Sequence, residues 1–186
     1  MLEFATTDLA GVILVEPQVH GDERGFFLET YHEQKYRDGG IAATFVQDNQ
    51  SRSKRGILRG LHGQSPDCQG KLIHCIEGEI FDVAVDVRLG SPTFGKFVTA
   101  VLSAENFRQV YVPPGLVHGF VVTSDVAQVE YKCTSFYRPE QEFCVRWDDP
   151  EIGIPWPVSD PVLSDKDRDA PRLNEIREDL LLPFEG

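Results

Sequence analysis

Apolar and polar residues alternate along most of the chain. The clearest example is the segment 79–88, in which every second position from Phe81 to Val87 is apolar. Successive side chains of a strand point to opposite faces, so this alternation predicts a β-strand with one fully apolar face. A helical period is present only at 32–37 and 173–181.

Ten further segments carry the strand signal, and glycine, proline, aspartate and serine separate them. In chain order they are 12–15, 26–31, 44–50, 57–62, 71–77, 97–102, 109–112, 119–122, 127–133 and 142–147. Many short strands spaced about 8–12 residues apart favour an all-β sandwich or barrel over alternating strands and helices.

The C-terminal segment differs from the rest of the chain. Residues 148–167 contain four prolines and show little periodicity, but Ile152, Ile154 and Trp156 provide apolar anchors. A length of 186 residues fits one domain with a sizeable core. We therefore expect a single domain over 1–186, in which the segment from about 148 to 186 wraps across the barrel.

The charge balance restricts the partners. Lysine and arginine number 18 against 30 aspartates and glutamates, which gives a net charge of −12. Nucleic-acid binding depends on cations that replace counterions, so we expect no nucleic-acid partner. The sequence has no run of 18 apolar residues and no signal-peptide pattern at its start. We accordingly expect no membrane association and a cytoplasmic location.

Four cysteines are present, and none forms a CxxC pair. They are Cys68, Cys75, Cys133 and Cys144, of which three have apolar neighbours. This pattern favours reduced structural thiols over a disulfide framework or a zinc site.

Two histidines have neighbours that indicate chemistry. His118 closes a PxGxxH turn at 113–118, which is the second half of a cupin signature, and His62 ends the segment 57–62. In metal-binding cupins the first half supplies an HxH pair, but here Gly60 and Gln64 flank His62 at that spacing. A mononuclear site needs three or four ligands, so we expect no metal and disfavour a metal-dependent cupin dioxygenase.

Polar side chains also recur within the segment 47–62 at positions expected to face the inside of the barrel. Gln47, Asn49, Arg59 and His62 are the members of this set. Buried arginine is rare unless it is paired, and the planar guanidinium suits phosphate binding. We therefore expect Arg59 to lie among apolar neighbours and to contact a small anionic substrate.

Several motifs together carry a family resemblance. They are GDERGFF at 21–27, QDNxSxSxxGxLRGLHxQ at 47–64, DVAVDxRxGSPTFG at 82–95, LSAEN at 102–106 and LSxKDxxAP at 163–171. From residue 12 to about 171 the chain resembles the dTDP-4-dehydrorhamnose 3,5-epimerases. This resemblance implies a cupin-type jelly-roll barrel of antiparallel strands with few short helices. It also implies a homodimer in which N-terminal strands are exchanged or packed across the interface.

The resemblance assigns four catalytic roles. His62 matches the general base, Asp167 the carboxylate that orients it, Tyr131 the acid on the opposite sugar face, and Lys71 the lysine that steadies the enolate. The substrate contacts that it implies are Arg24, Phe27, Glu29, Gln47, Asn49, Arg59, His118, Tyr137, Glu142 and Lys166. Tyr137 is also the alternative candidate for the acid.

These assignments agree with the chemistry of epimerisation beside a ketone. A base removes a proton from the carbon next to the carbonyl, and an acid returns a proton to the other face. A histidine held by a carboxylate titrates near neutral pH, and a fixed ammonium stabilises the enolate oxygen. The reaction requires no metal or redox cofactor, so none is expected.

The implied reaction converts dTDP-4-dehydro-6-deoxy-D-glucose to dTDP-4-dehydro-L-rhamnose. Three features depart from the family pattern. Gly63 stands where a bulky or aromatic residue is common, the stretch 65–68 replaces the usual loop, and His74 stands where arginine or an aromatic residue is common. A smaller wall beside the base could admit another sugar. The alternatives are therefore a 3- or 5-mono-epimerase of another nucleotide deoxysugar, and a catalytically inactive cupin-fold ligand-binding protein.

Overall fold

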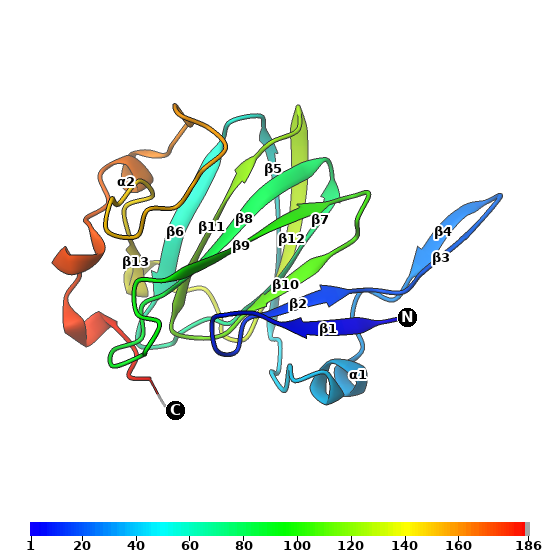
Figure 1. Cartoon of the computed structure of the whole chain (residues 1–186), viewed down its shortest axis with the longest axis horizontal. Helices are drawn as coiled ribbons and strands as arrows, with labels where there is room; N and C mark the ends of the chain where they lie inside the picture. Colours follow the sequence, from blue (N-terminus) through cyan, green and yellow to red (C-terminus); the bar gives the residue numbers. More distant parts are fainter. Residues whose placement is uncertain (185–186) are drawn as a thin grey trace.

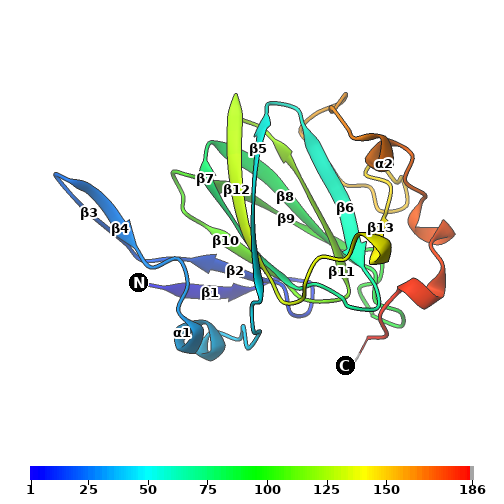
Figure 2. The ribbon, with the colours of Figure 1, turned by 180° about the vertical axis from the view of Figure 1, so that it is seen from behind.

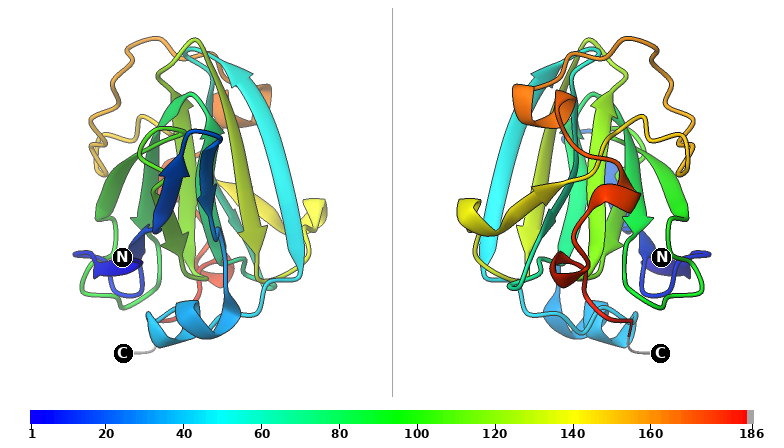
Figure 3. Two further views of the ribbon diagram at one scale, coloured as in Figure 1. Left: turned by 90° about the vertical axis from the view of Figure 1, so that its right-hand side faces the viewer. Right: turned by 90° about the vertical axis from the view of Figure 1, so that its left-hand side faces the viewer.

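Two antiparallel sheets face each other and enclose a barrel in the computed structural model, which describes residues 1–184 (Figures 1 and 3). The first sheet has six strands, in the order β1 (Glu3–Thr6), β2 (Ile13–Glu16), β10 (Gln109–Val112), β7 (Lys71–Glu77), β12 (Val126–Cys133) and β5 (Gln47–Lys54). The second has five, in the order β13 (Glu142–Cys144), β6 (Leu58–Gln64), β11 (Leu116–Val122), β8 (Glu79–Asp86) and β9 (Phe97–Ser103).

The predicted all-β jelly-roll barrel is confirmed. Each of the eleven predicted segments overlaps a strand, and β7 and β10 agree with the prediction at both ends. Two strands are additional: β1, and β3 (Val19–Asp22), which pairs with β4 (Gly25–Leu28). Most residues of β1 and all residues of β3 are exposed. Neither strand therefore shows the alternation of buried and exposed positions from which strands are predicted.

The helical predictions have different outcomes. Helix α1 (Glu33–Asp38) confirms the prediction at 32–37. The prediction of a continuous helix at 173–181 is wrong. The structure has two separate 3₁₀ turns, η2 (Leu173–Glu175) and η3 (Glu178–Leu180), with an extended backbone between them. That break lets Leu173 and Leu181 both enter one apolar cluster against the barrel. Two short elements were not predicted, α2 (Asp165–Arg168) and η1 (Pro139–Gln141).

Three apolar clusters hold these layers together. The first lies between the two sheets and contains Ile73 from one sheet and Ile80 from the other. The second covers the outer face of the five-stranded sheet, where the C-terminal segment supplies Ile152 and Leu173. Figure 2 shows this segment along the side of the barrel formed by β6 and β13. In the third, Tyr36 of α1 packs on the outer face of the six-stranded sheet.

The β3–β4 hairpin stands apart from these clusters. It forms a separate two-stranded sheet and projects away from the barrel (Figures 1 and 2). Among the described residues, no helix is long and apolar enough to cross a membrane.

Candidate active site

A pocket of about 400 Å³ lies between the two sheets, within the usual size range of small-ligand sites. Strands β5, β7 and β12 form one wall, and β6, β11 and β13 form the opposite wall. The lining side chains are mostly polar: Gln47, Asn49, Gln50, Ser51, Arg59, His62, Lys71, His118, Phe120, Tyr131, Tyr137, Glu142 and Lys166.

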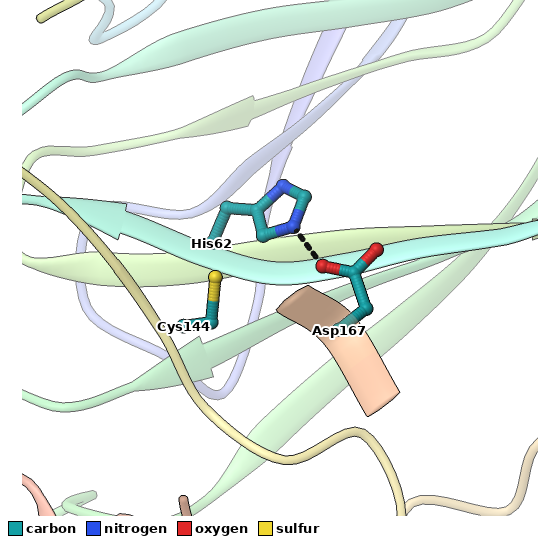
Figure 4. Close-up of side chains that lie close together, drawn as sticks. All are labelled: His62, Cys144 and Asp167. Carbon is teal, nitrogen blue, oxygen red and sulfur yellow. Dashed lines mark hydrogen bonds and ion pairs between the residues drawn. The ribbon is translucent and has the colours of Figure 1, made fainter. Parts of the chain in front are cut away.

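His62 forms a hydrogen-bonded pair with a carboxylate from another part of the chain. Its Nε2 lies 2.6 Å from Oδ1 of Asp167, which is 2% exposed (Figure 4). Asp167 is on α2, where the side chain of Ser164 caps the helix by accepting a hydrogen bond from the Asp167 N–H. This bond occupies Nε2 and leaves Nδ1 as the ring nitrogen that can take a proton from a substrate.

The environment keeps Asp167 ionised. Burial alone would raise the pKa of this carboxyl, but the hydrogen bonds from His62 and Ser164 outweigh it, and the pKa lies below its ordinary value. A carboxylate that remains charged fixes the orientation of the imidazole and stabilises the imidazolium formed when the ring takes a proton. The pair therefore has the arrangement of a general base and its orienting partner.

Tyr131 lies on the opposite wall. It belongs to β12 of the six-stranded sheet, whereas His62 belongs to β6 of the five-stranded sheet, and both line the same pocket. Burial raises the pKa of the Tyr131 hydroxyl. Near neutral pH it is therefore protonated and can donate a proton from the wall facing His62.

Lys71 supplies a cation in the same pocket. It begins β7 and pairs in register with Cys133 of β12. Removal from solvent lowers the pKa of its ammonium, and the nearby charges of Glu142 and Asp82 partly offset that effect. An ammonium with little solvent around it can stabilise an oxyanion more strongly than one in water.

Hydrogen bonds hold several polar side chains of the pocket in place. Gln47 donates to Oδ1 of Asn49 at 3.0 Å and accepts the N–H of Tyr137 at 2.9 Å. Glu142 accepts from the ammonium of Lys166 at 2.6 Å and from the Tyr137 hydroxyl at 3.3 Å. These side chains are consequently positioned before a ligand enters.

His118 forms a second histidine–carboxylate pair. Its Nε2 lies 2.8 Å from Oδ2 of Asp82, and both residues are buried. His118 is the register partner of His62 on the neighbouring strand, and both line the pocket. The side chain of His118 is 9% exposed and that of His62 is 21% exposed, so His62 is the more accessible of the two.

The prediction that Arg59 is buried is wrong. Arg59 is exposed, although it lines the pocket, and its Nε donates to Oγ of Ser53 at 3.1 Å. The pocket opens to solvent at this point, so the guanidinium keeps its hydration and needs no buried carboxylate partner.

The structure gathers eleven of the fourteen predicted site residues. Asp167 bonds to His62 from behind the pocket. The other ten line the pocket: Gln47, Asn49, Arg59, His62, Lys71, His118, Tyr131, Tyr137, Glu142 and Lys166. The remaining three lie outside this pocket. Arg24 pairs with Asp22 at the tip of the hairpin, Phe27 is 71% exposed on β4, and Glu29 pairs with Lys35 of α1 at 2.8 Å.

Sequence reasoning missed several pocket residues. Ser51 has a buried Oγ with no hydrogen-bond partner among residues 1–184. It follows Gln47 and Asn49 at a spacing of two on β5, so the strand period alone could have placed it on the same face. Cys144, expected to be a structural thiol, does not line the pocket but is the register partner of His62 on β13. That neighbour depends on strand pairing and has no local signal.

Neither Gly63 nor His74 lines the pocket, which corrects the interpretation of a more open wall beside the base. Gly63 faces away from the cavity, where an added Cβ would meet the ring of Phe143. The Phe143 ring would have to shift to admit a larger side chain at this position. His74 also lies outside the pocket, with Nε2 3.6 Å from a carboxylate oxygen of Glu130.

Comparisons with known proteins agree with this geometry. The family model described as dTDP-4-dehydrorhamnose 3,5-epimerase matches residues 6–175. A dTDP-4-dehydrorhamnose 3,5-epimerase from Pseudomonas aeruginosa is 56% identical over 159 residues, which are 84% of this chain and 88% of that protein.

Solved structures give the same result. A dTDP-6-deoxy-D-glucose-3,5-epimerase from Legionella pneumophila, in complex with dTDP-4-keto-L-rhamnose, is 48% identical with a TM-score of 0.97, and 100% of both chains is covered. A 3′-monoepimerase from Streptomyces bikiniensis, in complex with dTDP-quinovose, is 37% identical with a TM-score of 0.89, over 95% of this chain and 91% of that chain. The chain belongs to the dTDP-4-dehydrorhamnose 3,5-epimerase family.

Proposed function

We propose that the protein converts dTDP-4-dehydro-6-deoxy-D-glucose to dTDP-4-dehydro-L-rhamnose by epimerising carbons 3 and 5. The observation that carries this proposal is the His62–Asp167 pair on one wall of a polar pocket with Tyr131 on the opposite wall. A ligand-binding protein has no need of a base and an acid on facing walls. The relative with dTDP-4-keto-L-rhamnose bound supports the choice of sugar nucleotide.

The reaction follows from the positions of these side chains. His62 takes the proton from the carbon beside the ketone, and Asp167 stabilises the resulting imidazolium. Lys71 stabilises the charge that develops on the ketone oxygen. Tyr131 then donates a proton to the opposite face of the same carbon, which inverts it. Repetition at the second carbon gives the doubly epimerised sugar.

Incubation of the protein with dTDP-4-dehydro-6-deoxy-D-glucose in deuterated water tests this function. We expect one deuteron at carbon 3 and one at carbon 5 of the product, counted by NMR or mass spectrometry. Exchange at one carbon only would identify a mono-epimerase, an alternative that the similarity to the 3′-monoepimerase keeps open. Binding of the nucleotide without any exchange would identify an inactive ligand-binding protein.

We also propose that the active form is a homodimer in which each hairpin reaches the pocket of the other copy. Arg24, Phe27 and Glu29 resemble substrate contacts but lie outside the pocket of their own chain. The hairpin exposes Phe26 and Phe27 at 62% and 71%, and a partner surface would cover these rings. A mass near twice 20.9 kDa by light scattering supports this assembly, and a monomer contradicts it.

The chain organisation and location complete the proposal. We infer a single domain in which the segment from about 148 onward wraps the barrel and brings Asp167 to His62; residues 185 and 186 of this predicted range lie outside the described part. A cytoplasmic location is supported by four free thiols, which suit a reducing compartment. Limited proteolysis tests the single-domain proposal, which predicts one resistant fragment.

A further inference from the structure

Three side chains with metal-ligating atoms converge behind the pocket. The ligand atoms of His62, Cys144 and Asp167 all lie within 4.8 Å of one another. Figure 4 shows the three side chains close together. The three residues come from β6, β13 and α2, so the cluster exists only in the folded chain. The pairing of β13 with β6 fixes Cys144 opposite His62, and the Ser164 cap fixes Asp167.

These donors form the set that zinc prefers. Zn²⁺ binds thiolate sulfur at about 2.3 Å and imidazole nitrogen or carboxylate oxygen at about 2.0–2.2 Å, which places tetrahedral ligand atoms roughly 3–4 Å apart. The cluster is close to that spacing, so small side-chain movements complete it. His62 also lines the open pocket, which leaves room for water as a fourth ligand.

We propose that His62, Cys144 and Asp167 bind Zn²⁺ or a similar thiophilic divalent cation, and that the bound ion reversibly blocks His62 as a base. The inhibitory part rests on the proposed function, whereas the binding part does not. This ion is an inhibitor and takes no part in the epimerisation.

The protons and charges balance in this step. Burial raises the pKa of the Cys144 thiol to about 11, so the free protein holds a thiol and metal binding releases its proton to solvent. The metal takes the place of the Nε2 proton of His62 beside Asp167, and that proton moves to Nδ1, so the ring stays neutral and Nδ1 can no longer act as the base. Lys71 and Lys166 oppose a cation near Cys144, and Glu142 offsets them.

Cobalt titration of the tag-free protein tests the binding. Co²⁺ bound to a thiolate gives a sulfur-to-metal charge-transfer band, so we expect this band to saturate at one equivalent and to disappear on addition of Zn²⁺. Cys144→Ser should abolish the band and weaken Zn²⁺ binding by at least about tenfold. Cys68→Ser is the matched control, because Cys68 is also half-buried but lies outside the cluster, and the band should remain.

Solvent-deuterium exchange into the substrate tests the inhibition. We expect Zn²⁺ to stop exchange by the unmodified protein and a chelator to restore it, with each variant compared with its own metal-free rate. Cys144→Ser should need at least about tenfold more Zn²⁺ for the same loss. Absence of the cobalt band, or an unchanged band in Cys144→Ser, overturns the site. A bound metal without loss of exchange overturns the inhibition. A normal band in a protein with no epimerase activity rejects the proposed function and leaves the site intact.

Discussion

The barrel pocket and the β3–β4 hairpin contain two kinds of predicted site residue. The pocket collects the groups that move protons, and hydrogen bonds or burial hold each of them. The hairpin carries Arg24, whose side chain is 85% exposed, and Phe27 on a separate two-stranded sheet. In the proposed homodimer, one chain contains the whole chemical apparatus, whereas the hairpin of the second copy supplies part of the substrate-binding surface. Pocket variants should therefore change the rate, and hairpin variants should change binding.

The largest effect is expected from His62→Ala. Loss of the base should lower solvent exchange at both carbons by about 10²–10⁴-fold or more, because His118, the other carboxylate-bound histidine of this wall, is less accessible than His62. Binding of dTDP, measured by calorimetry, should change little. Retention of more than about a tenth of the exchange rate would remove His62 from its assigned role.

Lys71→Met should lower kcat by about 10²–10³-fold, as expected for loss of one group that stabilises an oxyanion. The pH profile adds a second readout. Because the pKa of Lys71 is lowered, the ammonium loses its charge as pH rises through a value below the ordinary lysine range near 10.4. The pKa of Tyr131 is raised, so Tyr131 stays protonated there. The first loss of activity at high pH should be present in the unmodified protein and absent from Lys71→Met.

Asp167→Asn should lower kcat by about 10²-fold, since it preserves the shape of the side chain and removes the charge that stabilises the imidazolium. The same charge should be lost in the unmodified protein only when pH falls through the lowered pKa of Asp167. Above about pH 4, the acidic side of the pH–rate profile of the unmodified protein should therefore not depend on Asp167. An unchanged kcat in Asp167→Asn would mean that the pair serves structure alone.

Ser51→Ala should have the smallest effect. The buried hydroxyl has no partner among the described residues, so its removal should leave the melting temperature unchanged or slightly higher. If the substrate supplies the missing partner, KM should rise by about 2–10-fold, which corresponds to one hydrogen bond. Ser53→Ala is the control on the same strand, because Ser53 already accepts from Arg59. Equal KM values for Ser51→Ala and the unmodified protein would contradict a substrate contact.

Much of the fold could be predicted from the sequence because strand alternation is a local signal. The exposed strands β1 and β3 lack that signal, and the turns at Leu173–Glu175 and Glu178–Leu180 separate because both ends pack on the barrel. In the candidate site, the motifs predicted which residues take part but gave no distances between their side chains. The neighbours of His62 show the limit: Cys144 reaches it by strand pairing, and Asp167 by the path of the C-terminal segment.

A mixture of two defective chains tests most directly whether the site combines one chain's pocket with the other chain's hairpin. His62→Ala chains keep the hairpin and Arg24→Ala chains keep the base, so a mixed dimer contains one complete site and one doubly defective site. Random re-association gives about half mixed dimers. Exchange activity, measured at a substrate concentration too low to fill the Arg24→Ala site, should recover to about a quarter of that of the unmodified protein. Activity that never exceeds the sum of the two separate variants would show that Arg24 and His62 do not meet across the subunits.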